Sequence, residues 1–188
     1  MRHASVAALL FCAMSVTTRT GLAQRRDTLT IGQKYAGPLR ALREADLGTI
    51  SDGREMYRVL WLRSSHEAIA VRIVKDGTRY SVLTSVGPVW GREDSAPPRR
   101  DSMSLDPRAW AALQLRTALR DFWHLTAPVN RNGLDGAEWI LEGRRGGVYH
   151  AVDWWSPRPV EGHEGDYRHL VLDILSLGTD RVMPNAVY

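Results

Sequence analysis

Residues 68–85 carry the strongest structural signal in the chain, the pattern of a β-hairpin. Apolar residues recur at alternate positions on both sides of Asp76-Gly77. Asp-Gly favours a type I′ turn, because both central residues adopt positive φ and the turn matches the twist of the flanking strands. With Lys75 opposite Thr78, one face holds Ile69, Val71, Ile73, Tyr80 and Val82, and the other holds Arg72, Arg79 and Ser81. We therefore expect an antiparallel sheet with one covered, apolar face and one largely solvated face.

Two further parts of the chain have strand patterns. Residues 56–62 are apolar on both alternating faces, which predicts a strand that is covered on both sides. Residues 137–143 and 148–155 predict a second hairpin around residues 144–147. On one face of this hairpin the pattern gathers the residues expected to fill the core, which are Trp139, Leu141, Val152 and Trp154.

An amphipathic helix is predicted after each hairpin. At residues 106–125 Asp106 is a good N-cap and Pro107 at the first helical position loses no hydrogen bond. We expect this helix to bury an apolar stripe of Ala112, Leu115, Leu119 and Phe122. Ala111, Ala118 and Trp123 are expected to make that stripe wider. The second helix, ended by Gly178, is expected to bury Tyr167, Leu170, Val171, Ile174 and Leu177. A short helix is also predicted over residues 39–47.

Residues 87–104, rich in Gly, Pro and Arg, predict a long irregular segment. Loops of this length are often functional. Together the elements predict a single α+β domain over residues 24–188. It is expected to contain an antiparallel sheet of about five strands with two amphipathic helices packed on one face.

The N-terminal residues have the pattern of a secretory signal peptide. Arg2 and His3 precede the uncharged apolar residues 4–16, and residues 21–23 supply small side chains for a signal peptidase. The apolar run is shorter than the roughly 20 residues that cross a bilayer as a helix. We expect residues 1–23 to be removed, which leaves an exported protein, periplasmic or extracellular, with no transmembrane segment. An uncleaved N-terminal anchor is the alternative.

Cysteine and charge exclude several classes of function. Cys12, the only cysteine, lies in the predicted signal peptide, so disulfides, thiolate metal ligands and cysteine nucleophiles are excluded from the rest of the chain. Removal of Arg2 and Arg19 lowers the formal net charge from +4 to +2. Acidic residues are interleaved with the arginines, which argues against nucleic acid as a partner.

His150 and Glu142 are the candidate catalytic residues, and they would serve a small hydrolase. A carboxylate beside an imidazole is the minimum for general base catalysis, but the sequence shows no nucleophile, oxyanion donor or metal with them. In one register of the second hairpin Glu142 faces Tyr149, and in a register shifted by one residue it faces His150. A strand histidine that bonds a neighbour is the alternative interpretation.

Residues 163–169 contain the best candidates for a metal site, with two histidines and two acids in His163, Glu164, Asp166 and His169. Acids are also favoured in the first turn of a helix, because they complement its dipole. The same segment therefore has a structural explanation. We predict no metal and no cofactor.

Trp155 and Arg72 are the candidate binding residues. Trp155 is predicted to point away from Trp154, so it is covered by the N-terminal segment or contacts a ligand or partner. Arg72 lies on the face that is predicted to be solvated. We interpret the chain as an exported, non-enzymatic binding domain. It would contact an envelope protein or a small ligand through this face or through residues 87–104.

Several short motifs carry a resemblance. Residues 57–63, 122–123, 149–150 and 155–157, together with GLDGAEWILE at residues 133–142, are similar to those of a family of uncharacterised secreted or envelope proteins of bacteria. The resemblance covers most of the expected domain. It implies export, but the family has no known activity, so it implies no ligand and no catalytic residue.

Overall fold

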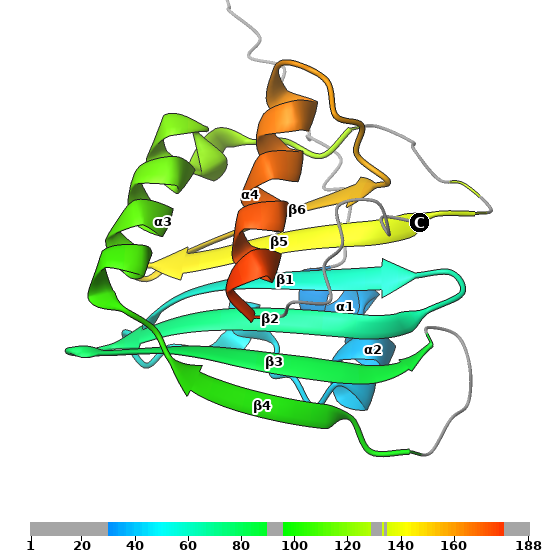
Figure 1. Cartoon of the computed structure of the whole chain (residues 1–188), viewed down its shortest axis with the longest axis horizontal. Helices are drawn as coiled ribbons and strands as arrows, with labels where there is room; N and C mark the ends of the chain where they lie inside the picture. The colour runs from blue at the N-terminus through cyan, green and yellow to red at the C-terminus, as the bar shows by residue number, and fades with distance from the viewer. Residues whose placement is uncertain (1–29, 90–95, 129–132, 134, 179–188) are drawn as a thin grey trace, which may run out of the picture.

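The computed structural model describes residues 30–89, 96–128, 133 and 135–178. They form an α+β architecture, as predicted, in which one antiparallel sheet has helices on both faces (Figure 1). The predicted signal peptide lies outside the described residues.

The described sheet has six strands in the order β4-β3-β2-β1-β5-β6, each antiparallel to its neighbours. The strands are β1 (Glu55–Arg63), β2 (Glu67–Asp76), β3 (Arg79–Val89), β4 (Arg99–Ser104), β5 (Ala137–Arg145) and β6 (Val148–Trp155). The predicted count of about five is one short, because β4 lies in residues 87–104, which were expected to be irregular. β4 is an edge strand with every residue exposed, so it has no apolar alternation by which the sequence could indicate it.

Both hairpins form, but with registers that differ from those predicted. In the first hairpin Asp76 pairs with Arg79, so the two-residue turn is Gly77-Thr78 rather than Asp76-Gly77. The observed pairing differs from the predicted one by two positions, because Lys75 pairs with Tyr80 rather than Thr78. An even shift keeps each side chain on its predicted face, because side chains alternate with a period of two.

In the second hairpin Glu142 pairs with Ala151, and Gly143 pairs with His150. Neither of the two predicted registers is therefore correct. The turn is Gly146-Gly147, with φ of 57° and 80°. Two consecutive positive φ values suit a type I′ turn, which allows β5 and β6 to pair up to the residues that flank it.

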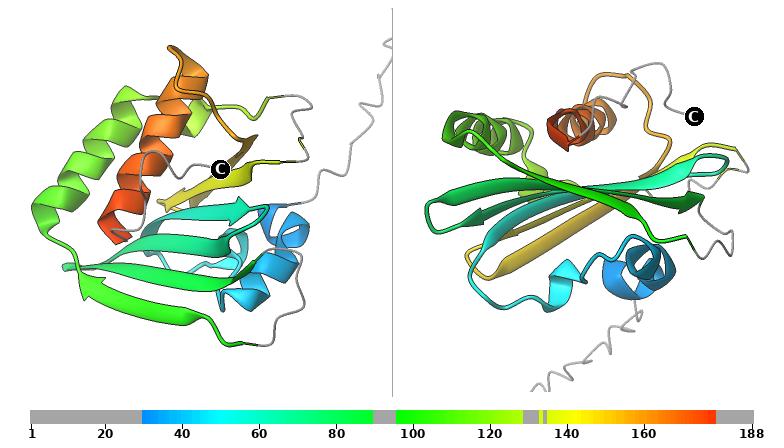
Figure 2. Two further views of the ribbon diagram at one scale, coloured as in Figure 1. Left: turned by 45° about the vertical axis from the view of Figure 1, so that its right-hand side comes forward. Right: turned by 60° about the horizontal axis from the view of Figure 1, so that its bottom comes forward.

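α3 (Pro107–Leu119) and α4 (His163–Gly178) lie side by side on one face of the sheet (Figure 2). The core beneath them contains Trp139 and Trp154, as predicted, and the Trp154 ring stacks on that of Tyr167 with centroids 5.3 Å apart. The predicted stripe of α4 is confirmed: four of its members are buried and Leu177 is partly buried. The predicted start of α3 is also confirmed, because the Asp106 side chain accepts a hydrogen bond from the backbone of Arg108.

The buried side of α3 is not the one predicted. Ala112 is exposed, and Leu115 and Leu119 have exposed fractions of 60% and 76%. The residues that α3 buries are Trp110, Leu113 and Thr117. The helix ends at Leu119, and Asp121, with a φ of 48°, turns the chain before the 3₁₀ turn η2 (Phe122–His124). Phe122 therefore reaches the core from outside the helix, so its helical spacing from Leu115 and Leu119 does not identify the buried side.

The opposite face of the sheet is covered by residues 31–49, which we call the N-terminal cover (Figure 2). It consists of α1 (Ile31–Lys34), α2 (Ala36–Ala41) and the 3₁₀ turn η1 (Leu47–Thr49). Its apolar side chains pack on Leu60, Leu62, Ala68, Ala70 and Ile140. The expectation of a largely solvated face is therefore wrong, whereas the expectation that residues 56–62 are covered on both sides is confirmed. The helix predicted over residues 39–47 is found only at residues 39–41, because α2 begins at Ala36 and ends at Ala41.

Candidate functional site

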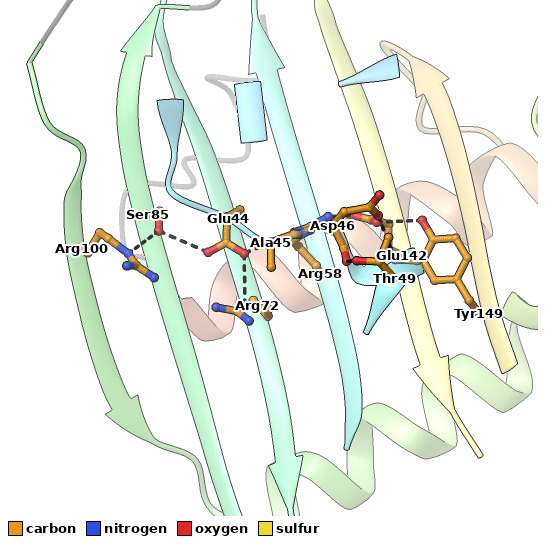
Figure 3. Close-up of polar contacts among 11 residues, drawn as sticks. Glu44, Ala45, Asp46, Thr49, Arg58, Arg72, Ser85, Arg100, Glu142 and Tyr149 are labelled. Carbon is orange, nitrogen blue, oxygen red and sulfur yellow. Dashed lines mark hydrogen bonds and ion pairs between the residues drawn. The ribbon is translucent and has the colours of Figure 1, made fainter. Parts of the chain in front are cut away.

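A buried ion pair between Arg58 and Glu142 lies at the centre of the face beneath the N-terminal cover (Figure 3). Arg58 in β1 is paired across the sheet with Glu142 in β5, so the two side chains share a face. The Arg58 Nε donates to Glu142 Oε2 at 2.6 Å, and both side chains are fully buried. Tyr149 from β6 donates its hydroxyl to Glu142 Oε1 at 2.8 Å. Each oxygen of this buried carboxylate therefore has a donor, as burial of a charge requires.

Glu44 extends the pair into a larger network, which we call the charged cluster: Arg58, Glu142, Glu44 and Arg72. Glu44 lies in the N-terminal cover, and its Oε2 is 3.3 Å from Arg58 Nη1 and 3.1 Å from Arg72 Nε. The contact with Arg72 is an ion pair without hydrogen-bond geometry. Arg58 Nη1 also donates to the carbonyl of Ala45. The cluster thus joins three strands to the cover.

Burial dominates the electrostatics of the cluster. It raises the pKa of Glu142, although Arg58 and Tyr149 act in the opposite direction. It lowers the pKa of the Arg72 guanidinium, Glu44 opposes this shift, and the neighbouring charges of Arg58, Arg100 and Arg54 add to it. Arg72 therefore lies among like charges, with one carboxylate shared between it and Arg58. A further anion near Arg72 would be favourable.

A groove of about 740 Å³ lies beside the charged cluster. Arg72 on β2 pairs with Leu83 on β3, and Leu83 pairs with Ser102 on β4, so these residues share the face of the charged cluster. The polar side chains that line the groove include Arg54, Arg72, Arg79, Ser81, Ser102 and Ser104, with Asp76 as the one acid. We call this surface the arginine groove.

The arginine groove has the chemistry of an anion site. Its volume is in the range of small-ligand pockets, roughly 300–1,000 Å³. Arg79 is exposed, Arg72 is partly buried, and Arg54 is bound to Asp52 through Nε at 2.7 Å. Guanidinium groups bind carboxylates and phosphates through paired hydrogen bonds, and serine hydroxyls supply further donors.

The structure does not bring His150 and Glu142 together. Glu142 pairs with Ala151, the neighbour of His150, so the two side chains point to opposite faces of the sheet. His150 lies on the side of α3, where its Nε2 is 3.1 Å from the carbonyl oxygen of Leu125 and its ring is 5.1 Å from that of Phe122. Burial lowers the pKa of His150. These contacts match the structural interpretation of the histidine rather than a catalytic pair with Glu142.

A second pocket, of about 350 Å³, includes His150 in its lining. The lining residues are Trp123, His124, Arg145, Val148, Tyr149 and His150. The set contains no carboxylate that could accept a proton from the imidazole, so it does not supply the acid–base pair of the predicted hydrolase.

The two candidate binding residues lie far apart in the sheet. Trp155 pairs with Glu138 at one end of β5, whereas Arg72 is two strands away from β5, level with Glu142. Trp155 is half-buried and packs against Gly136, where a Cβ atom would come within 3.1 Å of its ring. Only Arg72 of the two lines the arginine groove.

The predicted metal candidates have structural roles in part. Glu164 accepts hydrogen bonds from the backbone of Arg158 at 2.8 Å and from its Nη2 at 2.9 Å. His163 and His169 are exposed on α4. Within the described residues no group of three or more His, Cys, Asp or Glu is arranged to hold a metal ion.

A second polar network ties the N-terminal cover to β5 and β6. The Tyr35 hydroxyl donates to Glu138 Oε1 at 2.7 Å and lies 3.1 Å from Asp153 Oδ2. Lys34 forms ion pairs with the same two carboxylates. Burial, together with the nearby charge of Glu138, raises the pKa of Tyr35. The cover is therefore fixed at two points, here and at Glu44.

Sequence reasoning missed Arg58 and Glu44. One signal was present: Arg58 is the only charged residue among residues 56–62, a strand predicted to be covered on both sides. A charge in such a strand requires a buried partner. The sequence does not identify that partner, because Glu142 meets Arg58 only through the pairing of β1 with β5.

No helix in the described part of the chain combines the length and the apolar character needed to cross a membrane. No protein-family model and no curated protein matches the sequence. The resemblance to secreted and envelope proteins stays a prediction.

Proposed function

We propose that the protein is an exported, non-enzymatic binding protein that holds a small anionic ligand in the arginine groove. The observation that carries the proposal is the placement of Arg72, Arg79 and Arg54 around one groove with a single acid, Asp76, in its lining. Export rests on the signal-peptide pattern of residues 1–23 and on the resemblance.

Arg72 has the central role in this proposal. Its guanidinium forms an ion pair with Glu44 of the N-terminal cover, and burial, together with the neighbouring positive charges, lowers its pKa. A carboxylate or phosphate group in the groove would offset that repulsion and would meet a side chain that is already ordered. An ordered donor loses less conformational entropy when the ligand binds.

The test is calorimetric titration of the protein with phosphate, sulfate and small dicarboxylates. Arg79→Gln removes an exposed groove cation without touching the charged cluster, and we expect it to weaken binding by roughly 10-fold or more, because a charge-assisted hydrogen bond contributes about 1.5–3 kcal/mol. Arg72→Gln should weaken binding further. Arg40→Gln is the matched control, since Arg40 is exposed on α2 and lies outside the groove lining. Binding that is absent in the wild type, or equal in Arg79→Gln and Arg40→Gln, contradicts the proposal.

Export is tested separately. When the full chain is expressed in a bacterial host, the N-terminal peptide recovered from the periplasm or medium should begin near Gln24. Recovery only from the cytoplasm, with residues 1–23 intact, would contradict export and would leave the groove proposal standing.

A further inference from the structure

The outer side of α3 carries an apolar surface that the described residues do not cover. Its members are Ala111, Ala112, Leu115, Ala118 and Leu119, which share one side because each of the other four is three or four residues from Leu115 along the helix. All five are exposed. We call this surface the α3 stripe.

Neighbouring contacts fix the direction in which the α3 stripe points. Arg116 and Arg120 of α3 form ion pairs with Asp173 of α4 at 3.1 and 3.5 Å, and Trp110 and Leu113 face the sheet. α4 flanks α3 on one side only (Figure 2). The stripe is therefore held outward by contacts on the other sides of the helix.

Charge at the two ends of the stripe is opposite in sign. Arg108 lies at its N-terminal end and forms no ion pair with another residue in the part of the chain that the structure describes. Asp121 lies just beyond its C-terminal end, with 73% of its side chain exposed, and bonds His124 at 2.6 Å. Arg108 is seven residues before Leu115 and Asp121 is six residues after it. At about 1.5 Å per helical residue, Arg108 lies about 10 Å from Leu115 toward the start of the helix, and Asp121 lies past the other end, two residues after Leu119.

We infer that the α3 stripe is the interface of a homodimer, in which two copies of α3 pack antiparallel about a two-fold axis at Leu115. An isologous interface needs a surface that is complementary to itself. In this arrangement Leu119 meets the small side chain of the partner's Ala111, and Arg108 lies level with the partner's Asp121. The alanines allow the two helices to approach closely, and the two charge pairs select the antiparallel register.

Charge reversal tests the register. The full chain is studied by light scattering and sedimentation over a range of concentrations, and the wild type should have twice the mass of the 21.1 kDa chain. Arg108→Glu should weaken dimerisation by roughly 10-fold, because it replaces two exposed charge pairs with two repulsive contacts, and Asp121→Lys should do the same. The double variant Arg108→Glu/Asp121→Lys should restore it, because the pair is re-formed with its signs exchanged. Arg40→Glu, which changes the same charge on α2, is the control and should leave the dimer unchanged.

Cross-linking tests the position of the axis. In a Cys12→Ser background, Leu115→Cys should form a disulfide-linked dimer under mild oxidation, because the two copies of residue 115 meet on the axis. Leu119→Cys is the control, since Leu119 is even more exposed than Leu115 but lies one helical turn away, and it should cross-link much less. A wild type that stays monomeric, a dimer that survives Leu115→Glu, or reversal variants that fail to compensate would each overturn the inference. Unchanged melting temperatures of the variants exclude unfolding as the cause.

Discussion

The two faces of the sheet are covered in different ways. Beneath α3 and α4 the contacts are apolar and aromatic, and one continuous cluster extends from Tyr57 to Leu175. Beneath the N-terminal cover the apolar contacts form two smaller clusters, and the charged cluster and the Tyr35 network lie among them. One face is therefore held mainly by non-directional burial, and the other depends on specific donors and acceptors.

This difference predicts different responses to mutation. Loss of a methylene from an apolar core costs the transfer free energy plus a cavity, and neighbouring side chains relax in part. Loss of one partner from a buried ion pair leaves a charge with no compensation, which is more costly. The face beneath the cover should therefore be the more sensitive to conservative change.

The largest effect is expected for Glu142→Ala. It leaves the more distant Glu44 as the one carboxylate bound to the buried guanidinium of Arg58, so the free energy of unfolding should fall by about 3–5 kcal/mol, as measured by urea unfolding. The matched control is Glu55→Ala, which removes a partly exposed partner of Lys75 on the same strand as Arg58 and should cost far less. Equal losses would mean that the buried pair does not stabilise this face.

The apolar face was the more predictable of the two. Alternation in residues 68–85 and the stripe of α4 both follow from burial on one side, and both were identified correctly. The exception is α3, where Phe122 extended an apolar pattern beyond the end of the helix. Asp121 is the residue that breaks the pattern, and positive φ at an aspartate is not evident from sequence.

The face beneath the cover was predicted poorly for a physical reason. The polar residues Arg72, Arg79 and Ser81 in the first hairpin predicted a solvent-exposed face. In the sequence, a polar side chain that is buried with a partner looks the same as one that is exposed. Arg79 is exposed as expected, whereas Arg72 is partly buried against Glu44, which is distant in sequence and meets β2 only in the folded protein. Arg72 was nevertheless singled out as a binding candidate, and it does line the arginine groove.

A smaller effect is expected for Tyr35→Phe, which removes the hydroxyl that donates to Glu138 at 2.7 Å. We expect a loss of about 1.5–3 kcal/mol, because the acceptor is a charged group. Hydrogen exchange should become faster at residues 31–49 and stay unchanged in α4. The control is Tyr57→Phe on the apolar face, where the hydroxyl contacts are long, at 3.4 and 3.5 Å, and the cost should be lower. A reversed order of the two losses would contradict the contrast between the faces.

Each face also carries a titratable group with a shifted pKa, Glu142 fully buried and His150 partly buried, and the two shifts have opposite consequences. The pKa of Glu142 is raised by burial above its ordinary value of 4.5, so its contribution to stability is complete below that pH and is lost as pH rises through the folded-state pKa. The pKa of His150 is lowered by burial below 6.5, so its contribution is complete above that pH and is lost as pH falls through the folded-state pKa.

The smallest effect is therefore expected in how stability depends on pH, when the wild type is compared with His150→Gln. Between about pH 7.5 and about pH 5 the wild type should lose stability, because the unfolded chain binds the proton more readily than the ring packed against Phe122 and Leu125. His150→Gln should be less stable at every pH, since it loses the ring contacts, but its urea midpoint should vary less over this interval. Glu142→Gln is the comparison from the other face, and its urea midpoint should vary more over this interval than that of the wild type, because it removes a contribution that is lost as pH rises. A His150→Gln profile parallel to that of the wild type would show that the acid-sensitive step lies elsewhere in the sheet.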